Sequence, residues 1–351
     1  MTVEEARAVR GEDGFDVGAM NSWLAERVDG LAGEPEVRQF PGGASNLTYL
    51  LRYPDRDLIL RRPPGGTKAK SAHDMRREHR IQSGLKPVFP YVPEMLALCT
   101  DESVIGGDFY VMEKLDGIIL RRELPSGLTL TPAEARQLCH SVIDRLVELH
   151  SIDPDEAGLS DIGKGRGYVR RQVTGWSDRY RRAQTWNVPS YRRVMAWLDA
   201  NQPDDVRTCV IHNDYRFDNV VLDAGDPQRI IGILDWEMAT LGDPLMDLGG
   251  GLAYWMQTDD GRLALAHARQ PTHLPGMLTR REVVEYYCAR TGLPSDNWTF
   301  YEVFGLFRLA VIAQQIYYRY YHKQTHNPAF KRMWILVRYL HRRAARLIRA
   351  A

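Results

Sequence analysis

The residues with the clearest capacity for chemistry lie in one short stretch, "VIHNDYRFDN", at residues 210–219. This stretch places a histidine, two aspartates and two asparagines directly behind β-branched apolar residues. Asp235 comes 21 residues after Asp214 and directly follows a second apolar run, "IIGIL". Polar residues at strand ends can be ordinary turn residues, or they can hold a metal ion beside a reacting hydroxyl.

Phosphoryl transfer needs a particular set of side chains. One carboxylate accepts the proton of the attacking hydroxyl, while an amide and a second carboxylate hold Mg²⁺ on the nucleotide phosphates. Mg²⁺ prefers oxygen ligands and often takes only one or two of them from the protein. Asp214, Asn219 and Asp235 supply these residue types on what we predict to be two adjacent strand ends. The whole set therefore favours the catalytic interpretation over that of simple turns.

The elements that must position these groups begin with a predicted small sheet at about residues 36–115. The runs "LTYLLRYP" and "DLILRRPP" predict a hairpin because a "PDRD" turn joins them. The run "DFYVMEKL" predicts a further strand that ends at an Asp-Gly turn. The stretch "SAHDMRREHRIQSGL" predicts a helix with Ser71 as N-cap and Asp74 at the capping-box position.

Beyond the sheet the pattern is mainly helical. Thr131 and Glu134 form a capping box with proline at the first helical position, and Thr279 with Glu282 forms another. Two long helices, rich in aromatic residues and arginine, are predicted to close the chain. A β-containing island at about residues 207–250 carries both acidic strand ends. This layout predicts an α+β protein with a small sheet lobe and a larger, mainly helical lobe.

The composition excludes several other classes of protein. At 351 residues the chain is longer than most single cores. The four cysteines include no C-x-x-C pair, which argues against standard zinc and thioredoxin sites and fits a reducing cytosol. No signal peptide and no apolar span of about 20 residues is visible, so we predict a cytoplasmic protein without a membrane partner. A G-x-x-x-x-G-K-[ST] loop and a G-x-S-x-G elbow are both missing.

The motifs together resemble a known family. "HNDYRFDN" followed by "ILDWE" is similar to the catalytic and metal-binding loops of the aminoglycoside-phosphotransferase-like kinases, relatives of protein and choline kinases. "LDWEMATLGDPLMDLG", "FPGGASNLTYLL" and "LRRPPGG" resemble in particular the branch whose kinase domains occur fused to acyl-CoA dehydrogenases. The resemblance spans roughly residues 36–255. It implies a bilobal, protein-kinase-like α+β fold that binds ATP and Mg²⁺.

The resemblance also implies a role for each residue of the motif. Asp214 would be the catalytic base, and His212 would shape the loop behind it. Asn219 and Asp235 would be the Mg²⁺ ligands. Asp247 would brace the catalytic loop or cap the next helix. No role follows for Glu237.

The first lobe is then expected to hold the nucleotide. Gly42 and Gly43 of "PGGASN" would let the backbone approach the phosphates, and Ser45 would donate a hydrogen bond to them. Backbone groups between Met112 and Lys114 would pair with adenine in the connector between the lobes.

One element departs from the usual kinase pattern. The strand "LILRR" offers Arg61 and Arg62 but no lysine for the phosphates, and strand alternation alone does not decide between them. The resemblance favours Arg61, with Glu78 as its carboxylate partner. A guanidinium can bind phosphate with two hydrogen bonds, so the substitution is compatible with nucleotide binding. It also leaves open a nucleotide-binding pseudokinase or interaction module.

The phosphate acceptor is predicted from charge. Residues 261–351 carry 15 Lys and Arg against 4 Asp and Glu, a net charge of +11, although the whole chain has only +1. Residues 161–193 add nine basic residues against two acidic ones. A clustered positive charge favours an anionic small molecule, with a hydroxyacyl-CoA as the specific candidate, over a cationic aminoglycoside or other antibiotic. An ordinary solvated, arginine-rich surface is the alternative.

Other partners are not expected. Nucleic acid remains a third interpretation of the basic tail, but no recognised binding motif accompanies the charge. The aromatic residues of the penultimate helix are expected mainly in the core, with an acyl pocket as the alternative. We predict an ATP-binding lobe at residues 1–115, whose first 35 residues lead in as a helical segment, and a catalytic, substrate-binding lobe at 116–351. The oligomeric state is not predicted.

Overall fold

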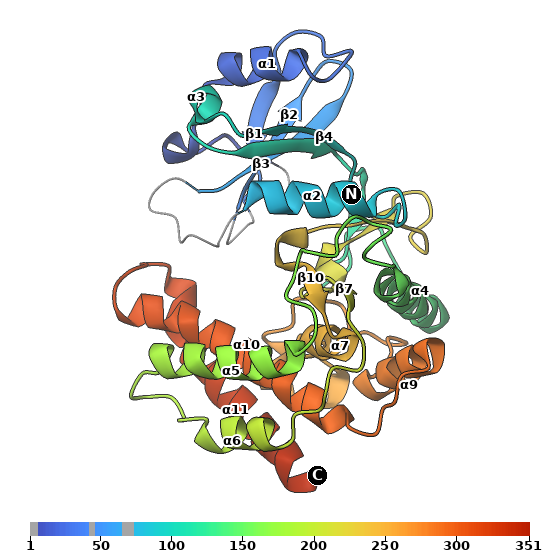
Figure 1. Cartoon of the computed structure of the whole chain (residues 1–351), viewed down its shortest axis with the longest axis vertical. Helices are drawn as coiled ribbons and strands as arrows, with labels where there is room; N and C mark the ends of the chain where they lie inside the picture. Colours follow the sequence, from blue (N-terminus) through green and yellow to red (C-terminus); the bar gives the residue numbers. More distant parts are fainter. Residues whose placement is uncertain (1–5, 42–45, 65–73) are drawn as a thin grey trace.

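The computed structural model describes residues 6–41, 46–64 and 74–351 of the chain. One end of the molecule is built on an antiparallel sheet with the strand order β1-β2-β3-β5-β4 (Figure 1). These strands are β1 (Glu36–Gln39), β2 (Leu47–Arg52), β3 (Asp57–Arg62), β4 (Met95–Cys99) and β5 (Phe109–Glu113). The predicted hairpin of β2 and β3 and the predicted strand β5 are confirmed.

Both faces of this sheet are buried because side chains alternate along each strand. One face packs with helix α1 (Val17–Ala25) and carries Tyr49, Leu51, Leu58, Leu60, Phe109 and Val111. The opposite face lies beside helix α2 (Met75–Leu85) and carries Leu50, Ile59, Tyr110 and Met112. Figure 1 shows α2 on the side of the sheet that is turned toward the rest of the molecule. Residues that share the face of Ile59 therefore point toward the helical lobe.

The start of α2 corrects one expectation. Asp74 is its N-cap, and the Asp74 side chain accepts a hydrogen bond from the Arg77 N–H. Ser71, the predicted N-cap, lies outside the described residues. The prediction failed because an aspartate can itself cap a helix, and here it stands directly before the first helical residue.

Two small sheets lie where the sheet lobe meets the helical lobe. One contains β6 (Gly117–Ile119), β8 (Val220–Asp223) and β9 (Ile230–Ile233), and the other pairs β7 (Cys209–Ile211) with β10 (Thr240–Gly242). The strands that precede the two acidic motifs, β7 and β9, thus belong to different sheets, and the prediction of two adjacent strand ends was wrong. A hydrogen bond of 2.8 Å from Leu234 N to the Asn219 carbonyl connects the two segments instead.

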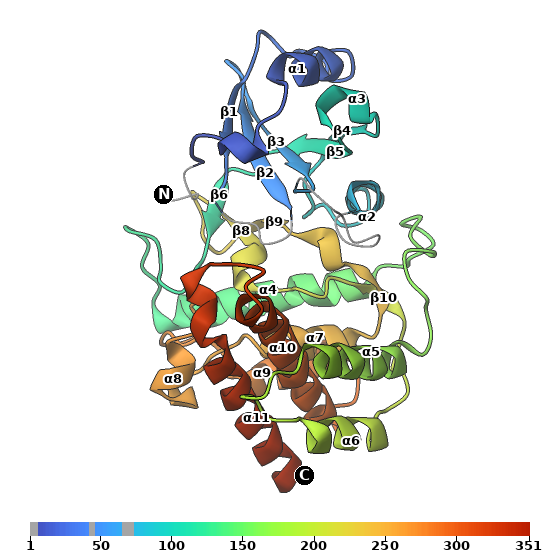
Figure 2. The same cartoon turned by 90° about the vertical axis from the view of Figure 1, so that its left-hand side faces the viewer.

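The rest of the chain is helical. The larger helices are α4 (Pro132–Ser151), α5 (Tyr168–Ala183), α6 (Arg192–Ala200), α7 (Pro244–Leu252), α9 (Arg280–Thr291), α10 (Trp298–Tyr321) and α11 (Met333–Ala350). Shorter pieces are α3 (Glu102–Ile105), α8 (Arg262–Leu265) and single 3₁₀ turns at Gly11–Asp13, Phe217–Asn219, Trp236–Met238, Thr258–Asp260 and Pro328–Arg332. The capping boxes predicted at Thr131 and Thr279 are both present. In Figures 1 and 2, α10 and α11 run side by side away from the sheet lobe.

This arrangement confirms the predicted α+β, two-lobed architecture. The core of the helical lobe includes fully buried aromatic side chains of α10, among them Phe300 and Phe307. Tyr321, the last residue of the same helix, is instead 43 % exposed. In the described part of the chain, no helix is both long and apolar enough to cross a membrane. All four cysteines are buried free thiols.

Candidate active site

A cleft of about 560 Å³ lies between the sheet lobe and the helical lobe. That volume falls within the range of small-molecule sites, which runs from about 300 to 1,000 Å³. Six of the residues singled out in the sequence line it: Arg61, Met112, Lys114, Asp214, Asn219 and Asp235. Gly42, Gly43 and Ser45 lie outside the described residues.

The loop that carries Asp214 is fixed from behind by Asp247 of α7. The Asp247 carboxylate accepts hydrogen bonds of 2.8 Å from the backbone N–H groups of His212 and Asn213. It also accepts one of 3.1 Å from His150 Nε2. Desolvation by itself would raise the pKa of Asp247, but the hydrogen bonds that it accepts from His150 and from the His212 backbone oppose the rise, and the pKa is lowered. A buried carboxylate with three donors is thus kept ionised and holds the loop in place.

His212 connects the two acidic motifs. Its ring is fully buried, with Nε2 3.0 Å from the Leu234 carbonyl and Nδ1 3.2 Å from the Asp214 N–H. The two partners assign a proton to Nε2 and a lone pair to Nδ1, which is the neutral ring. The imidazole therefore connects the backbone of Leu234, which precedes Asp235, with the backbone of Asp214. His212 does not line the cleft.

Hydrogen bonds hold one of the two carboxylate oxygens of Asp214. Its Oδ2 atom accepts hydrogen bonds from Arg216 Nη2 at 3.0 Å and from Asn219 Nδ2 at 3.3 Å. The Asn219 amide nitrogen also donates to the Asp214 carbonyl at 2.9 Å. Because the amide nitrogen faces Asp214, the Asn219 oxygen is turned away from it. In the described part of the chain, nothing donates to Asp214 Oδ1, so that atom remains available to accept a proton.

Arg216 is a cleft residue that the sequence interpretation missed. Besides Asp214 it approaches Asp218, at 3.4 Å, and its guanidinium lies 4.6 Å from the centre of the Tyr254 ring. Burial alone would lower the pKa of Arg216, but the charges of Asp214 and Asp218 raise it. In the sequence, Arg216 already stands between Asp214 and Asp218 of the same motif. Only the folded loop shows that this cation contacts the proposed base.

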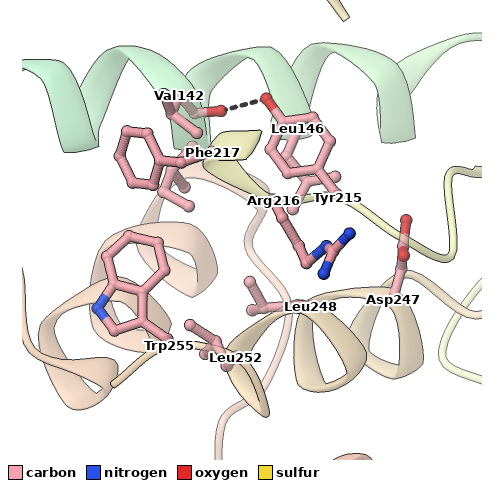
Figure 3. A pocket seen from close by; sticks show the side chains of 11 residues that line it. Val142, Leu146, Tyr215, Arg216, Phe217, Asp247, Leu248, Leu252 and Trp255 are labelled. Atoms are coloured by element: carbon pink, nitrogen blue, oxygen red, sulfur yellow. Dashed lines mark hydrogen bonds between the residues drawn. The ribbon is translucent and has the colours of Figure 1, made fainter. Parts of the chain in front are cut away.

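The back of this loop is closely packed. Figure 3 shows Arg216 and the neighbouring Tyr215 beside a small cavity of about 20 Å³ under α4. The Tyr215 hydroxyl donates a hydrogen bond of 2.6 Å to the Val142 carbonyl, which ties the loop to α4 (Figure 3). A void of this size holds about one water at most, so the back of the loop is closely packed against the lobe.

The opposite wall carries the ion pair predicted from the sequence. Arg61 Nη1 lies 2.5 Å from Glu78 Oε1, and Arg61 Nη2 lies 3.3 Å from Asp235 Oδ1. Glu78 is 2 % exposed, and burial raises its pKa while the charge of Arg61 opposes that rise. The Arg62 guanidinium instead lies 5.7 Å from the centre of the Phe15 ring. Arg61 is therefore the arginine that enters the cleft.

Two further contacts connect this pair to neighbouring groups. The Tyr110 hydroxyl donates 2.7 Å to Glu78, and Asn46 Nδ2 lies 3.3 Å from Glu78 Oε2 and 3.1 Å from Glu237 Oε2. Glu237, for which the sequence suggested no role, lies 3.8 Å from Arg61 and lines the cleft. The sheet lobe and the second acidic motif are thus joined by direct polar contacts.

Each of the two acidic turns contains a residue in the left-handed backbone conformation. Asn213 and Asp235 adopt φ values of 64° and 69°, the left-handed region that non-glycine residues rarely occupy. Two hydrogen bonds of the Asn213 side chain, from Tyr168 and to the Met238 carbonyl, hold the first turn. Such strain is tolerated where surrounding contacts fix the chain, and it is concentrated at functional sites.

Part of the cleft wall is apolar. This part includes Phe40, Ile59, Met112, Leu115, Ile119, Val221 and Leu234. The Lys114 ammonium is engaged by Asp57 at 3.0 Å and by Asp116, so its side chain is already paired. An apolar slot beside a chain connector suits a flat ring.

The distribution of positive charge differs from the expectation. Of the 15 basic residues in 261–351, Arg269 is the one that lines the cleft. Others form ion pairs elsewhere, as Arg280 and Arg343 do with Asp260. The net charge of the block therefore describes mainly the outer surface, and only single arginines bear on the cleft.

Comparison with known proteins places this geometry in a family. Residues 36–283 match the model of the phosphotransferase enzyme family, APH. The chain is 38% identical over 289 residues to acyl-CoA dehydrogenase family member 10 of Mus musculus, covering 82% of this chain and 27% of that protein. It is 34% identical to acyl-CoA dehydrogenase family member 11 of Rattus norvegicus, covering 87% of this chain and 40% of that protein. The chain thus spans well under half the length of these relatives.

Solved structures with the same fold support this assignment. A Ralstonia eutropha protein provisionally described as an aminoglycoside phosphotransferase is 32% identical, with a TM-score of 0.78 over 95% of this chain and 99% of that one. Macrolide 2'-phosphotransferase type I shares the fold at 21% identity, with a TM-score of 0.58 over 97% of this chain and 98% of the other. On these grounds the chain belongs to the APH phosphotransferase enzyme family and has its kinase-like fold.

Proposed function

We propose that this protein transfers a phosphoryl group from ATP to a hydroxyl of a small molecule. The observation that carries the proposal is the convergence of Asp214, Asn219 and Asp235 on one cleft with the Arg61–Glu78 pair. We further propose residues 1–115 as the ATP-binding lobe and residues 116–351 as the catalytic, substrate-binding lobe.

The residues fit Mg²⁺ by their chemistry. The Asn219 amide oxygen and the Asp235 carboxylate are hard oxygen donors, and both residues line the cleft. They would hold the metal, which when bound shields the charge of the phosphates. Arg61, already oriented by Glu78, would bind phosphate oxygens from the sheet side.

In the proposed reaction Asp214 accepts the proton of the attacking hydroxyl. Arg216 and Asn219 fix Oδ2 and leave Oδ1 to meet the acceptor. A base held in one orientation needs no rearrangement when the hydroxyl arrives, which is how positioning lowers a barrier. His212 and Asp247 contribute by holding the loop.

We propose an anionic acceptor, with a hydroxyacyl-CoA as the specific candidate. Arg269 lines the cleft and is exposed, and it forms no ion pair or hydrogen bond with any described residue. Its neighbour Gln270 is buried and accepts a hydrogen bond of 2.8 Å from Phe217 N, so Arg269 is anchored beside the catalytic loop. An unneutralised guanidinium at that place favours a carboxylate or phosphate on the acceptor. The names of the relatives, acyl-CoA dehydrogenase family members, are consistent with an acyl-CoA.

The direct test is ATP turnover with a panel of hydroxyacyl-CoAs, free hydroxy acids and aminoglycosides. We expect phosphorylation of an anionic hydroxy compound, and a fall in kcat of about 10²- to 10⁴-fold in Asp214→Asn, because general-base catalysis is worth about that much. Binding of ATP by the variant should stay within about twofold of wild type.

Two results would contradict the proposal. Turnover restricted to aminoglycosides would remove the anionic acceptor. ATP binding without transfer to any member of the panel, in wild type and Asp214→Asn alike, would favour a nucleotide-binding pseudokinase.

A further inference from the structure

A second hollow, separate from the cleft, lies at the turn between α10 and α11. Its volume is about 820 Å³, and it shares no lining residue with the cleft. The turn lies at the end of these helices nearer to the sheet lobe, as both views show (Figures 1 and 2). The hollow is lined by Tyr317, Tyr320, Tyr321, Lys323, Thr325, His326, Lys331, Arg332, Trp334 and Ile335.

The charge of this hollow is one-sided. Lys323, Lys331 and Arg332 are all exposed, and none of them forms an ion pair with a described residue. No acidic residue is among those that line the hollow. Elsewhere on α11, Arg343 forms an ion pair with Glu302, whereas the exposed Arg342 and Arg346 form none with a described residue. An unneutralised cluster around a concave surface is complementary to a ligand with more than one negative charge.

The aromatic side chains supply flat surfaces beside these cations. Tyr317 and Tyr321 are fixed through their hydroxyls, which accept hydrogen bonds from Asn187 Nδ2 at 2.9 Å and from Trp186 Nε1 at 3.1 Å. Tyr320 and Trp334 complete the walls. Aromatic rings next to lysine and arginine are the combination that binds bases by stacking and phosphates by charge.

Lys323 holds an unfavourable backbone conformation at this place. Its φ is 58°, where glycine would be unstrained at the end of a helix. The turn is closed by hydrogen bonds from Lys323 N to the Tyr320 carbonyl and from Gln324 N to the Arg319 carbonyl. A long cationic side chain is thus kept at a position that favours glycine, which points to a use for that side chain.

We propose that this hollow, the α10–α11 hollow, binds a nucleoside phosphate. A single nucleotide fits within the hollow, and its base and phosphates suit the flat rings and the three cations that form no ion pair with a described residue. The ligand could be the nucleotide end of a coenzyme A thioester acceptor, which rests on the proposed function, or a free nucleotide. The site itself does not depend on phosphoryl transfer.

The test is calorimetric titration of the whole protein with adenosine 3',5'-bisphosphate and with coenzyme A, with no other nucleotide present so that the hollow is not filled beforehand. We expect a binding event that belongs to the hollow. It should weaken at least tenfold in the double variant Lys331→Gln, Arg332→Gln, because hydrogen bonds between charged groups are lost. Tyr320→Ala should weaken it at least fivefold through lost stacking.

A matched control separates a site from general charge. The double variant Arg342→Gln, Arg346→Gln removes the same charge from exposed positions of α11 outside the hollow, and it should change the Kd less than twofold. Equal losses in both double variants would overturn the inference, as would wild-type affinity in Lys331→Gln, Arg332→Gln. Preferential binding of single-stranded DNA to the same residues would also overturn it.

The two sources of the ligand give different outcomes. Binding of coenzyme A and the bisphosphate, but of no second ATP, supports the acceptor. A second ATP bound per chain, lost in Lys331→Gln, Arg332→Gln, supports a free nucleotide. Either result stands even if no hydroxyacyl-CoA is phosphorylated, so failure of the proposed function would be recognised separately.

Discussion

At the scale of single residues, the cleft contains paired and unpaired cations. Arg61 and Arg216 are each held by two or more carboxylates, and those ion pairs fix the geometry of the site before any ligand arrives. Arg269 has no partner among the described residues. A cation with existing partners orients the protein, whereas an unpaired one gains most from an incoming anion.

Arg269→Gln should therefore affect the acceptor and not the nucleotide. We expect the KM for an anionic acceptor to rise about tenfold, since a hydrogen bond to a charged group contributes about 1.5–3 kcal/mol. The KM for ATP should be unchanged. Steady-state kinetics with each substrate varied in turn measures both. Arg262→Gln, an exposed arginine outside the cleft, is the matched control. Equal changes in the two KM values would contradict a role in acceptor recognition.

At the scale of elements, α2 carries Glu78 and so sets the position of Arg61. The helix begins at Met75 because Asp74 satisfies the Arg77 N–H, which would otherwise lack a partner. The first turn of α2 therefore depends on the Asp74 side chain, and Glu78, which positions Arg61, lies in that turn.

Replacing this cap should have a measurable cost. Asp74→Ala is expected to lower the free energy of unfolding by about 1 kcal/mol, the usual contribution of an N-cap. Ser71→Ala should change it by less than about 0.5 kcal/mol, because the helix starts after it. Urea denaturation of both variants decides between the two positions. A larger loss in Ser71→Ala would show that Asp74 is not the cap.

At the scale of the whole molecule, one buried network joins helices α4, α7 and α9 to the loop that carries Asp214. His150 of α4 contacts the Tyr287 hydroxyl of α9 at 2.7 Å and Asp247 of α7 at 3.1 Å. Desolvation lowers the pKa of His150. A neutral ring satisfies both contacts, donating from Nε2 to Asp247 and accepting from the hydroxyl at Nδ1.

This network predicts how stability depends on pH. The unfolded chain binds a proton at His150 near the ordinary pKa of about 6.5, and the folded chain binds it only at lower pH. The folded state is thus disfavoured by acid, and the free energy of unfolding should fall as pH drops below about 6.5. Urea denaturation at pH 7.5, 6.5 and 5.5 measures the slope.

His150→Gln tests the origin of that slope. The amide can still donate to Asp247 but does not titrate, so the variant should show a shallower decline below pH 6.5. His322→Gln, at an exposed position, should keep the wild-type decline. An unchanged slope in His150→Gln would assign the pH dependence to other groups, of which His79 and His341 also have lowered pKa values from burial.

The sequence by itself determined the family, the two-lobed plan and the hairpin of β2 and β3. It also gave the capping boxes at Thr131 and Thr279, both of which the structure contains. These features are local: a turn, a cap or a motif is specified by residues a few positions apart, so spacing alone predicts them. The net charge of residues 261–351 can be counted from the sequence. The count does not show which of these side chains face the cleft.

The tertiary structure decided everything that depends on which surfaces meet. Arg61 rather than Arg62 enters the cleft because the face that carries Ile59 is the one beside α2. The contact of Arg216 with Asp214 depends on the folded loop. Arg269 is placed by the bond between Gln270 and Phe217, which are 53 residues apart in the chain. Contacts over such distances follow from packing of the whole core, and no local pattern encodes them.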